Sequence, residues 1–197
     1  MTFQITRYRK TIVAMATLLA FCVAGTALAK RTSKSWQDSK AAETPRSSPE
    51  MDRLKFYLGE WDYTETYPKS GMYPNGAKNT GVYTSKRGPG GNSLVNGFHS
   101  QGPAGNFEAV LIMTWDPKEK AYKEYIFGDG FPGAVVGTGR FEGDALVYRI
   151  EFSAGGTTYK LRNVTRVVGT GKLVSEEYSQ SGDAPETLFV RVESTKR

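Results

Sequence analysis

His99 is the only histidine of the chain, and it follows Phe98 in a stretch of strand-like composition. If its ring points into the protein, it could ligate a metal or haem iron, or carry a proton near neutral pH. Otherwise it is an ordinary hydrogen-bonded histidine on a strand. A catalytic zinc site usually has three protein ligands, and the sequence holds no second histidine to join this one. We therefore do not expect zinc-dependent hydrolysis.

The acidic residues are scattered along the chain. Glu176 and Glu177 are adjacent, so on a strand their side chains face opposite ways and cannot act as an acid/base pair. Solvated outward positions are the default for carboxylates. Four other acids are placed where they could instead meet inside a closed barrel: Glu65, Glu124, Asp129 and Glu151.

Residues 128–133 match the letters of the dinucleotide fingerprint Gly-x-Gly-x-x-Gly. That motif needs a helix after its last glycine, because the pyrophosphate binds at the helix N-terminus. Here Pro132 lies within the motif and the strand-like residues 134–136 follow it, so we expect a hairpin loop. No serine stands in a Gly-x-Ser-x-Gly elbow. We assign no catalytic or metal-binding residue, and we expect a binding protein rather than an enzyme.

Residues 1–29 have the three parts of a secretory signal peptide. Three basic residues precede an apolar run over residues 12–24, and residues 27–29 (Ala-Leu-Ala) supply a cleavage site. The apolar run is shorter than the about 20 residues that span a membrane. An uncleaved N-terminal anchor is the alternative. We expect a periplasmic or secreted protein with no membrane attachment after cleavage.

Removal of the signal changes the charge and the cysteine content. The segment carries three of the six net positive charges and no acid, so the mature chain carries +3. Nucleic-acid readers show concentrated Lys/Arg stripes, and we predict no nucleic-acid partner. Cys22 is the only cysteine, so the mature chain can form no disulfide and no cysteine-ligated metal site.

The remainder divides into a tether and one domain. Residues 30–48 are predicted to be a disordered tether, because Lys, Ser, Thr, Ala and Pro dominate them. Residues 49–197 are predicted to be a β-barrel domain. It opens with a helix of about two turns, capped by Ser48 with Pro49 at its first position. Gly59 ends this helix, which we expect to cover one end of the domain.

After Gly59 the sequence alternates as half-buried strands do. Turn residues such as Gly, Pro, Asn and Asp separate about ten candidate strands. These are residues 60–67, 81–87, 93–101, 107–115, 121–127, 134–141, 145–152, 157–168, 173–179 and 187–193.

No later segment has a helical period long enough for the crossovers that parallel pairing needs. The sheet should therefore be an antiparallel meander. Closure into an up-and-down barrel removes the two exposed edges that such a meander would leave. We predict an all-β fold, an antiparallel up-and-down barrel of about ten strands, with a β-sandwich as the alternative.

Residues 58–61 (Leu-Gly-Glu-Trp), after the short helix, resemble the start of calycin-type (lipocalin-like) barrels, which open with a Gly-x-Trp motif. The rest is similar to the family called domain of unknown function 1579. That similarity rests on the same opening Leu-Gly-x-Trp, on the glycine-rich turn over residues 88–92 before a strand, and on residues 114–116 (Thr-Trp-Asp) leading to Tyr122 and then Asp129. The resemblance covers most of the predicted domain. It implies a lipocalin-like barrel and no particular activity.

The nitrobindin group is a more distant relative in this resemblance, and it holds haem in such a barrel through a histidine. That group's opening motif continues with further glycines after the tryptophan, whereas residues 62–64 here are Asp-Tyr-Thr. The haem analogy is weakened accordingly, and haem stays a minor alternative to having no cofactor.

Aromatic residues are spread over most of the predicted strands. In a wide barrel, aromatic walls with a few polar groups suit a hydrophobic or flat ligand; in a filled barrel the same rings are simply the core. In residues 122–127 the inward-facing row can be either 122, 124 and 126 or 123, 125 and 127. In residues 145–152 the alternation favours the apolar row 146, 148, 150 and 152 as the inner wall. The candidate cavity residues are Tyr63, His99, Trp115, Glu124, Tyr125, Tyr148, Arg149 and Tyr178.

Three functions remain open at this stage. The first is an exported barrel that binds a small, largely apolar molecule, with His99, Glu124 or Arg149 orienting its polar end. The second is a haem- or histidine-dependent barrel enzyme that relies on His99. The third is a structural or interaction protein of the cell envelope with a filled barrel, which acts through its outer face.

Overall fold

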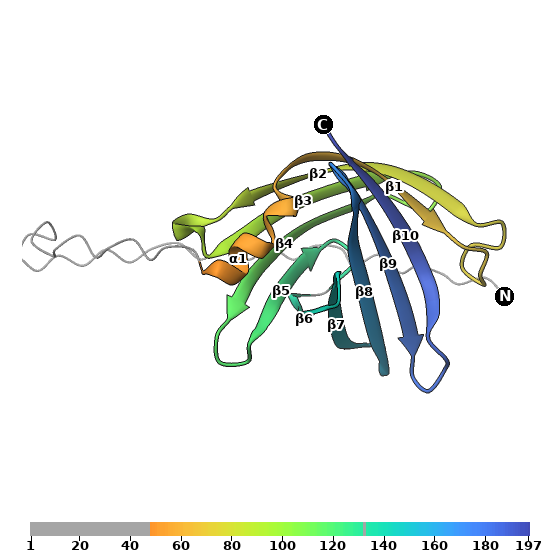
Figure 1. The fold of residues 1–197 in the computed structure, drawn as a ribbon. Helices are drawn as coiled ribbons and strands as arrows, with labels where there is room; N and C mark the ends of the chain where they lie inside the picture. The colour runs from red at the N-terminus through yellow and green to blue at the C-terminus, as the bar shows by residue number, and fades with distance from the viewer. Residues whose placement is uncertain (1–47, 132) are drawn as a thin grey trace, which may run out of the picture. The chain divides into compact units, whose positions relative to one another are not determined.

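The computed structural model describes residues 48–131 and 133–197. The predicted signal peptide (1–29) and all but the last residue of the predicted tether (30–48) lie outside the described residues. No helix within the described part is long and apolar enough to span a membrane. The domain is a closed barrel with a short helical segment at one end (Figure 1).

The helical segment has two parts, α1 (Pro49–Arg53) and the 3₁₀ turn η2 (Lys55–Tyr57). Ser48 caps α1 as predicted, since its hydroxyl oxygen accepts a hydrogen bond from the Met51 backbone N–H at 3.3 Å. The predicted single helix of two turns is interrupted at Leu54, whose ψ of 5° lies outside the α-helical range and starts the tighter turn.

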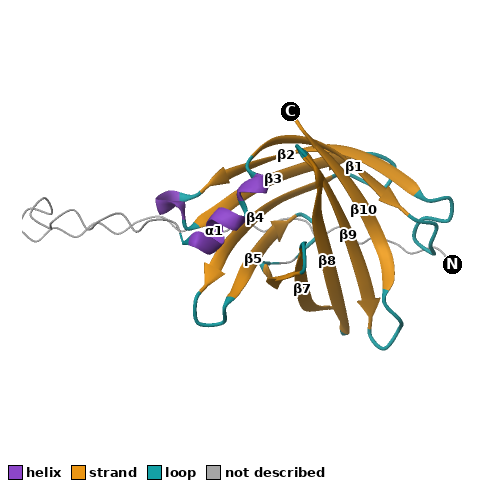
Figure 2. Ribbon diagram, viewed as in Figure 1, coloured by secondary structure: helices purple, strands orange, loops and turns teal. Residues whose placement is uncertain are grey.

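Ten strands follow (Figure 2). They are β1 (Gly59–Tyr67), β2 (Ala77–Arg87), β3 (Ser93–Gln101), β4 (Phe107–Asp116), β5 (Ala121–Gly128), β6 (Val135–Glu142), β7 (Ala145–Ala154), β8 (Thr157–Gly169), β9 (Lys172–Ser181) and β10 (Thr187–Lys196). A further 3₁₀ turn, η3 (Pro89–Gly91), links β2 to β3. β2 starts four residues before the predicted position because residues 77–80 continue the ladder with β1.

Each strand pairs antiparallel with its sequence neighbours, and β1 pairs with β10 to close the sheet. The predicted antiparallel up-and-down barrel is confirmed, and the sandwich alternative is wrong. Closure leaves no free edge for another strand to pair with. It also gives every strand one face toward a common interior.

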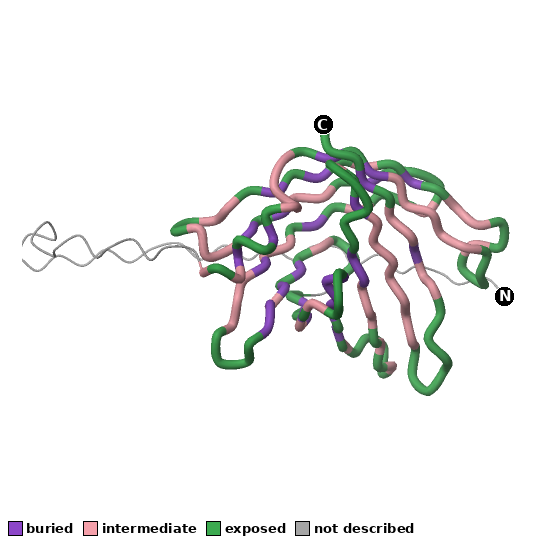
Figure 3. Tube along the Cα trace, viewed as in Figure 1, coloured by how far each residue is buried: buried purple, intermediate pink, exposed green. Residues whose placement is uncertain are grey.

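The barrel interior is lined by alternate residues of each strand. Along several strands, buried segments of the chain alternate with exposed ones (Figure 3). On β1 the inward row begins with Trp61 and Tyr63, which are almost fully buried, while Glu60 and Asp62 are exposed. Residues that lie directly opposite each other on neighbouring strands point to the same side of the sheet. Tyr83 of β2 lies opposite Trp61, and Phe98 of β3 lies opposite Tyr83, so both also point inward. One inward row per strand therefore follows from the pairing.

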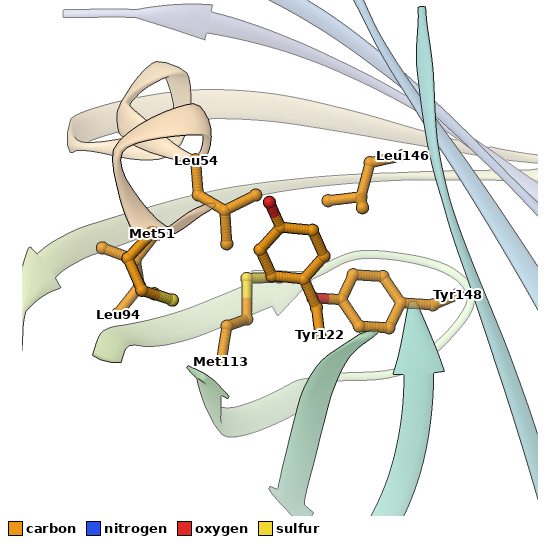
Figure 4. Packing of buried hydrophobic residues seen from close by; sticks show 7 residues of the cluster. All are labelled: Met51, Leu54, Leu94, Met113, Tyr122, Leu146 and Tyr148. Carbon is orange, nitrogen blue, oxygen red and sulfur yellow. The ribbon is translucent and has the colours of Figure 1, made fainter. Parts of the chain in front are cut away.

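The end of the barrel near α1, here called the helix end, is plugged by side chains. Met51 and Leu54 are fully buried there (Figure 4). They pack against Leu94, Met113, Tyr122, Leu146 and Tyr148. The Tyr122 hydroxyl donates a hydrogen bond to the Glu50 carbonyl at 2.9 Å, and the Trp61 indole N–H donates to the Tyr57 carbonyl at 2.8 Å. The helical segment is thus tied to the barrel at two points.

Two glycines make room for rings that lie flat against the wall. Gly81 pairs with Tyr63, and Gly139 pairs with Tyr148. A Cβ placed on Gly139 would lie 2.6 Å from the Tyr148 ring, and one on Gly81 would lie 2.6 Å from the Tyr63 hydroxyl oxygen. Because both glycines lack a side chain, these rings occupy space at the wall and leave the centre of the barrel free.

Candidate ligand-binding cavity

A cavity of about 440 Å³ lies inside the barrel, between the plug at the helix end and the loops at the opposite end. Its wall includes residues from nine of the ten strands together with Tyr57 of η2. Its most conspicuous lining groups are aromatic rings: Tyr57, Tyr63, Tyr67, Tyr83, Phe98 and Tyr148. The volume falls within the range of about 300–1,000 Å³ typical of small-molecule sites.

On one side of the barrel, aromatic rings form a continuous stack across three strands, and two of them, Tyr83 and Phe98, line the cavity. Trp61 stacks on Tyr83 with centroids 5.6 Å apart, and Tyr83 stacks on Phe98 at 4.9 Å. On the other side the wall is aliphatic, with Ile150 and Leu161 among its residues. Most of the wall is therefore suited to an apolar molecule.

Three carboxylates point into this largely apolar space: Glu65 of β1, Glu124 of β5 and Glu177 of β9. Glu124 is only 5% exposed. Burial, with a smaller contribution from the negative charge of Glu177, raises the pKa of Glu124 to about 8. Burial, and then the charge of Glu65, raises the pKa of Glu177 to about 7. Both carboxyls therefore titrate in the neutral range, unlike solvated glutamates.

The partners of these carboxylates differ. Glu65 accepts a hydrogen bond from the Tyr67 hydroxyl at 3.0 Å. Glu124 and Glu177 have no hydrogen bond or ion pair with any residue in the described ranges. The buried hydroxyl of Tyr148, which faces the same cavity, also has no hydrogen-bond partner there. Polar groups are thus present in the wall without the contacts that buried polar groups normally make.

The loop end of the barrel, opposite the plug, is where the cavity approaches the surface. Tyr73, residues 104–106 and Phe131 line it there. The buried Asn79 anchors one of these loops, since its side-chain N–H donates to the Gly105 carbonyl at 2.9 Å and its Oδ1 accepts from the Ala104 N–H at 3.0 Å. The rim is therefore held in place by a side chain of the barrel wall.

Three of the sequence-predicted cavity residues, Tyr63, Glu124 and Tyr148, line this cavity. Trp115 also faces inward but does not reach it, because its ring packs edge-on against Tyr122 at 5.0 Å in the plug of the helix end. Ligand binding by any of the four stays a prediction.

The other four predicted cavity residues lie on the outer face. His99 is half exposed, and its Nδ1 lies 3.1 Å from Glu108 Oε1. The remaining three are Tyr125, Arg149, which pairs with Glu142 at 2.6 Å, and Tyr178, whose ring lies 4.2 Å from the Arg162 guanidinium. Each stands next to an inward residue on its strand, and a shift of one position reverses the face of a strand side chain.

A histidine-held haem does not fit this interior. His99, the only histidine, lines an outer hollow with Asp62 and Glu193 instead of the cavity. The described residues also contain no group of three or more His, Cys, Asp or Glu side chains arranged to hold a metal ion. No histidine of this chain can therefore serve as an axial ligand inside the barrel.

Glu177, Tyr67 and Tyr83 line the cavity although the sequence did not predict it, and Glu65 lines it after two placements had been open. Glu65 and Tyr67 continue the inward row of Trp61, which their spacing of two already indicated. Glu177 has no comparable signal, because its neighbour Glu176 is equally acidic. Only the pairing of β9 with β8, in which Glu177 lies opposite the inward Asn163, assigns its face.

None of the known protein-family models matches the chain, and no curated protein matches it. Among solved structures, Rv2717c from M. tuberculosis is similar with a TM-score of 0.55 and 12% identity, over 77% of this chain and 99% of that one. The S-type phycobiliprotein lyase CPES from Guillardia theta matches with a TM-score of 0.47 and 9% identity, over 78% and 95% of the two chains. The likeness to Rv2717c shows a shared calycin-like fold.

Proposed function

We propose that this domain binds a small, largely apolar molecule inside its barrel, and that it does so in the periplasm or outside the cell. The observation that carries the proposal is the aromatic-lined cavity of about 440 Å³. A filled barrel would gain stability from close packing, whereas an unfilled interior costs stability. The similarity of the opening Gly-x-Trp motif and the later turns supports membership of the family called domain of unknown function 1579.

The wall suggests how such a molecule would be held. Removal of apolar surface from water supplies most of the favourable free energy, and aromatic rings offer large rigid surfaces for it. A few polar groups would then orient the bound molecule, and Glu124 and the Tyr148 hydroxyl are available for this because they lack partners in the described protein.

The test is uptake of the neutral fluorescent probe N-phenyl-1-naphthylamine by the purified domain. We expect its emission to rise on binding to the wild type and to stay near the free level with Val192→Phe, which fills part of the cavity wall. The matched control is Val136→Phe, whose side chain is 46% exposed on the outer face. Equal uptake by both variants would overturn the proposal. If the wild type and Val136→Phe take up the probe and Val192→Phe does not, native mass spectrometry of protein purified from its own host would identify the natural ligand.

Export is tested separately from binding. We expect the mature protein in the periplasmic or culture fraction, with an N-terminus at Lys30 by sequencing. Cytoplasmic protein that retains Met1 would refute export and leave the binding proposal untouched.

An interaction role is the second candidate, because the outer face carries an apolar row across four strands. Val95, Ile112, Tyr125 and Val136 lie directly opposite one another from β3 to β6, and three of them are exposed. Exposed apolar surface of this kind favours contact with another surface. Sedimentation of wild type and Val136→Lys distinguishes the roles: an assembly that the lysine disperses supports the interaction role, and a monomer in both cases refutes self-association.

A further inference from the structure

Apart from tyrosines, the ionisable side chains that line the described cavity are all acids. Glu65, Glu124 and Glu177 reach the cavity from β1, β5 and β9, and the described lining contains no lysine, arginine or histidine. By contrast, many acids on the outer face have cationic partners, as in Arg149–Glu142 at 2.6 Å. The interior carboxyls are thus left without the counter-charge that buried acids normally have.

Glu124 is the strongest sign that a positive charge is missing. Its carboxyl is almost completely buried, and no described residue donates a hydrogen bond to it or pairs with it. The Tyr148 hydroxyl, which belongs to the same cavity wall and interacts electrostatically with Glu124, is buried and without a hydrogen-bond partner as well. A buried carboxylate is stable only when an opposite charge or several donors compensate for its lost hydration. A ligand with both a positive charge and N–H donors would supply what this wall lacks.

The surrounding rings fit the same kind of ligand. Tyr57 and Tyr148 lie near Glu124, and Tyr67 lies beside Glu65. The faces of aromatic rings attract cations, most strongly where water is excluded. Metal ions, in contrast, need several oxygen ligands in one place, and no such group occurs among the described residues.

On the basis of the proposed binding function, we propose that the ligand is a small organic cation: a protonated or quaternary amine on an apolar body, with its positive charge held by Glu124 and Glu177. The apolar body would contact the tyrosine rings and the aliphatic wall. A molecule with a carboxylate or phosphate would be rejected, because it would bring negative charge against three acids with no base to offset it.

A specific pH dependence follows. The titratable groups that face Glu124 are Glu177 from β9, Tyr57 from η2 and Tyr148 from β7, and Glu65 from β1 faces Glu177. All of these become more negative or stay neutral as pH rises. Cation binding therefore releases a proton from Glu124 or Glu177 and strengthens between pH 6 and pH 9. A neutral ligand that accepts a hydrogen bond from protonated Glu124 would bind more weakly over the same interval.

The experiment compares three probes with the same apolar body: 1-adamantylamine (cation), 1-adamantanol (neutral) and 1-adamantanecarboxylate (anion). Each is titrated into the purified domain at pH 6 and pH 8.5 against bound N-phenyl-1-naphthylamine. At pH 8.5 we expect the amine to displace the probe at least tenfold more tightly than the alcohol and the carboxylate. We expect this preference to fall to less than threefold in Glu124→Gln/Glu177→Gln. The matched control Glu151→Gln/Glu176→Gln removes two outward-facing acids and should keep the preference.

The outcomes separate the two proposals. Equal binding of amine and alcohol, or a preference that survives Glu124→Gln/Glu177→Gln, would overturn the cation proposal and leave the apolar-ligand proposal standing. Tighter binding of the carboxylate would overturn it as well. Failure of all three probes and of N-phenyl-1-naphthylamine itself, with Val192→Phe indistinguishable from wild type, would overturn both.

Discussion

Replacement of Glu124 by glutamine should make the empty barrel more stable at neutral pH. Glutamine keeps the size of the side chain and removes the charge. The Glu124 carboxyl is almost fully buried without a partner among the described residues, so its ionised form is disfavoured in the folded state. The unfolded chain exposes the same carboxyl to water and ionises it near its ordinary pKa of 4.5.

The size of the effect follows from the two pKa values. The folded-state pKa is raised to about 8, so between pH 4.5 and pH 7 the unfolded state loses its proton while the folded state keeps it. Stability therefore falls as pH rises. At about 1.4 kcal/mol per pH unit, this interval removes about 3 kcal/mol from the free energy of unfolding. The loss continues until pH passes the folded-state pKa.

The assay is urea unfolding of wild type and Glu124→Gln, followed by tryptophan fluorescence at pH 4.5, 6, 7 and 8. We expect nearly equal free energies of unfolding at pH 4.5 and an advantage of about 3 kcal/mol for the variant at pH 7. The control Glu151→Gln changes a solvent-exposed carboxyl on the outer face of β7 and should follow wild type throughout. A variant that is less stable than wild type at pH 7, or displaced by the same amount at every pH, would refute the reasoning.

Three further substitutions test how the barrel is built. Gly139→Ala should cost about 1–3 kcal/mol by urea unfolding and reduce probe uptake, because the new methyl group would push the Tyr148 ring toward the cavity; unchanged uptake and stability would contradict this. Ser48→Ala should cost about 1 kcal/mol through loss of the helix cap, and a smaller loss is expected for Ser48→Asn, which can still cap. Asn79→Ala should cost about 1–3 kcal/mol and speed amide hydrogen exchange at Ala104, its hydrogen-bonded neighbour; exchange as slow as in wild type would show that the loop is anchored by other means.

Part of the cavity was accessible to sequence reasoning. The alternation after Gly59 puts Trp61, Tyr63 and Glu65 of β1 on one face, and the structure turns Tyr63 and Glu65 toward the cavity. The apolar row favoured for β7, which includes Tyr148, also points inward. For β5 the sequence left two rows open, because Tyr122 and Tyr125 are equally suited to a wall. The ladder with β4 decides between them, by placing Glu124 opposite the buried Met113.

The placement of His99 shows where such reasoning fails. A histidine next to a phenylalanine on a strand is equally compatible with either face, and its rarity in the chain made it a candidate. In the structure Phe98 points inward onto Tyr83 and His99 points outward to Glu108. A shift of one residue in the strand pairing would turn His99 inward and Phe98 outward, and the local composition does not determine this pairing.

The sequence by itself determined the ten-stranded meander and the capped helical segment, because alternation, turn residues and caps act over a few neighbouring residues. Only the tertiary structure decided between the predicted barrel and the sandwich alternative, by pairing β1 with β10. It also decided that Gly81 and Gly139 lie under tyrosine rings, and that acids from β1, β5 and β9 share one interior without a counter-charge among the lining residues. The physical reason is that these contacts join residues far apart in the chain. Their geometry depends on the closure of the whole barrel, which no local pattern encodes.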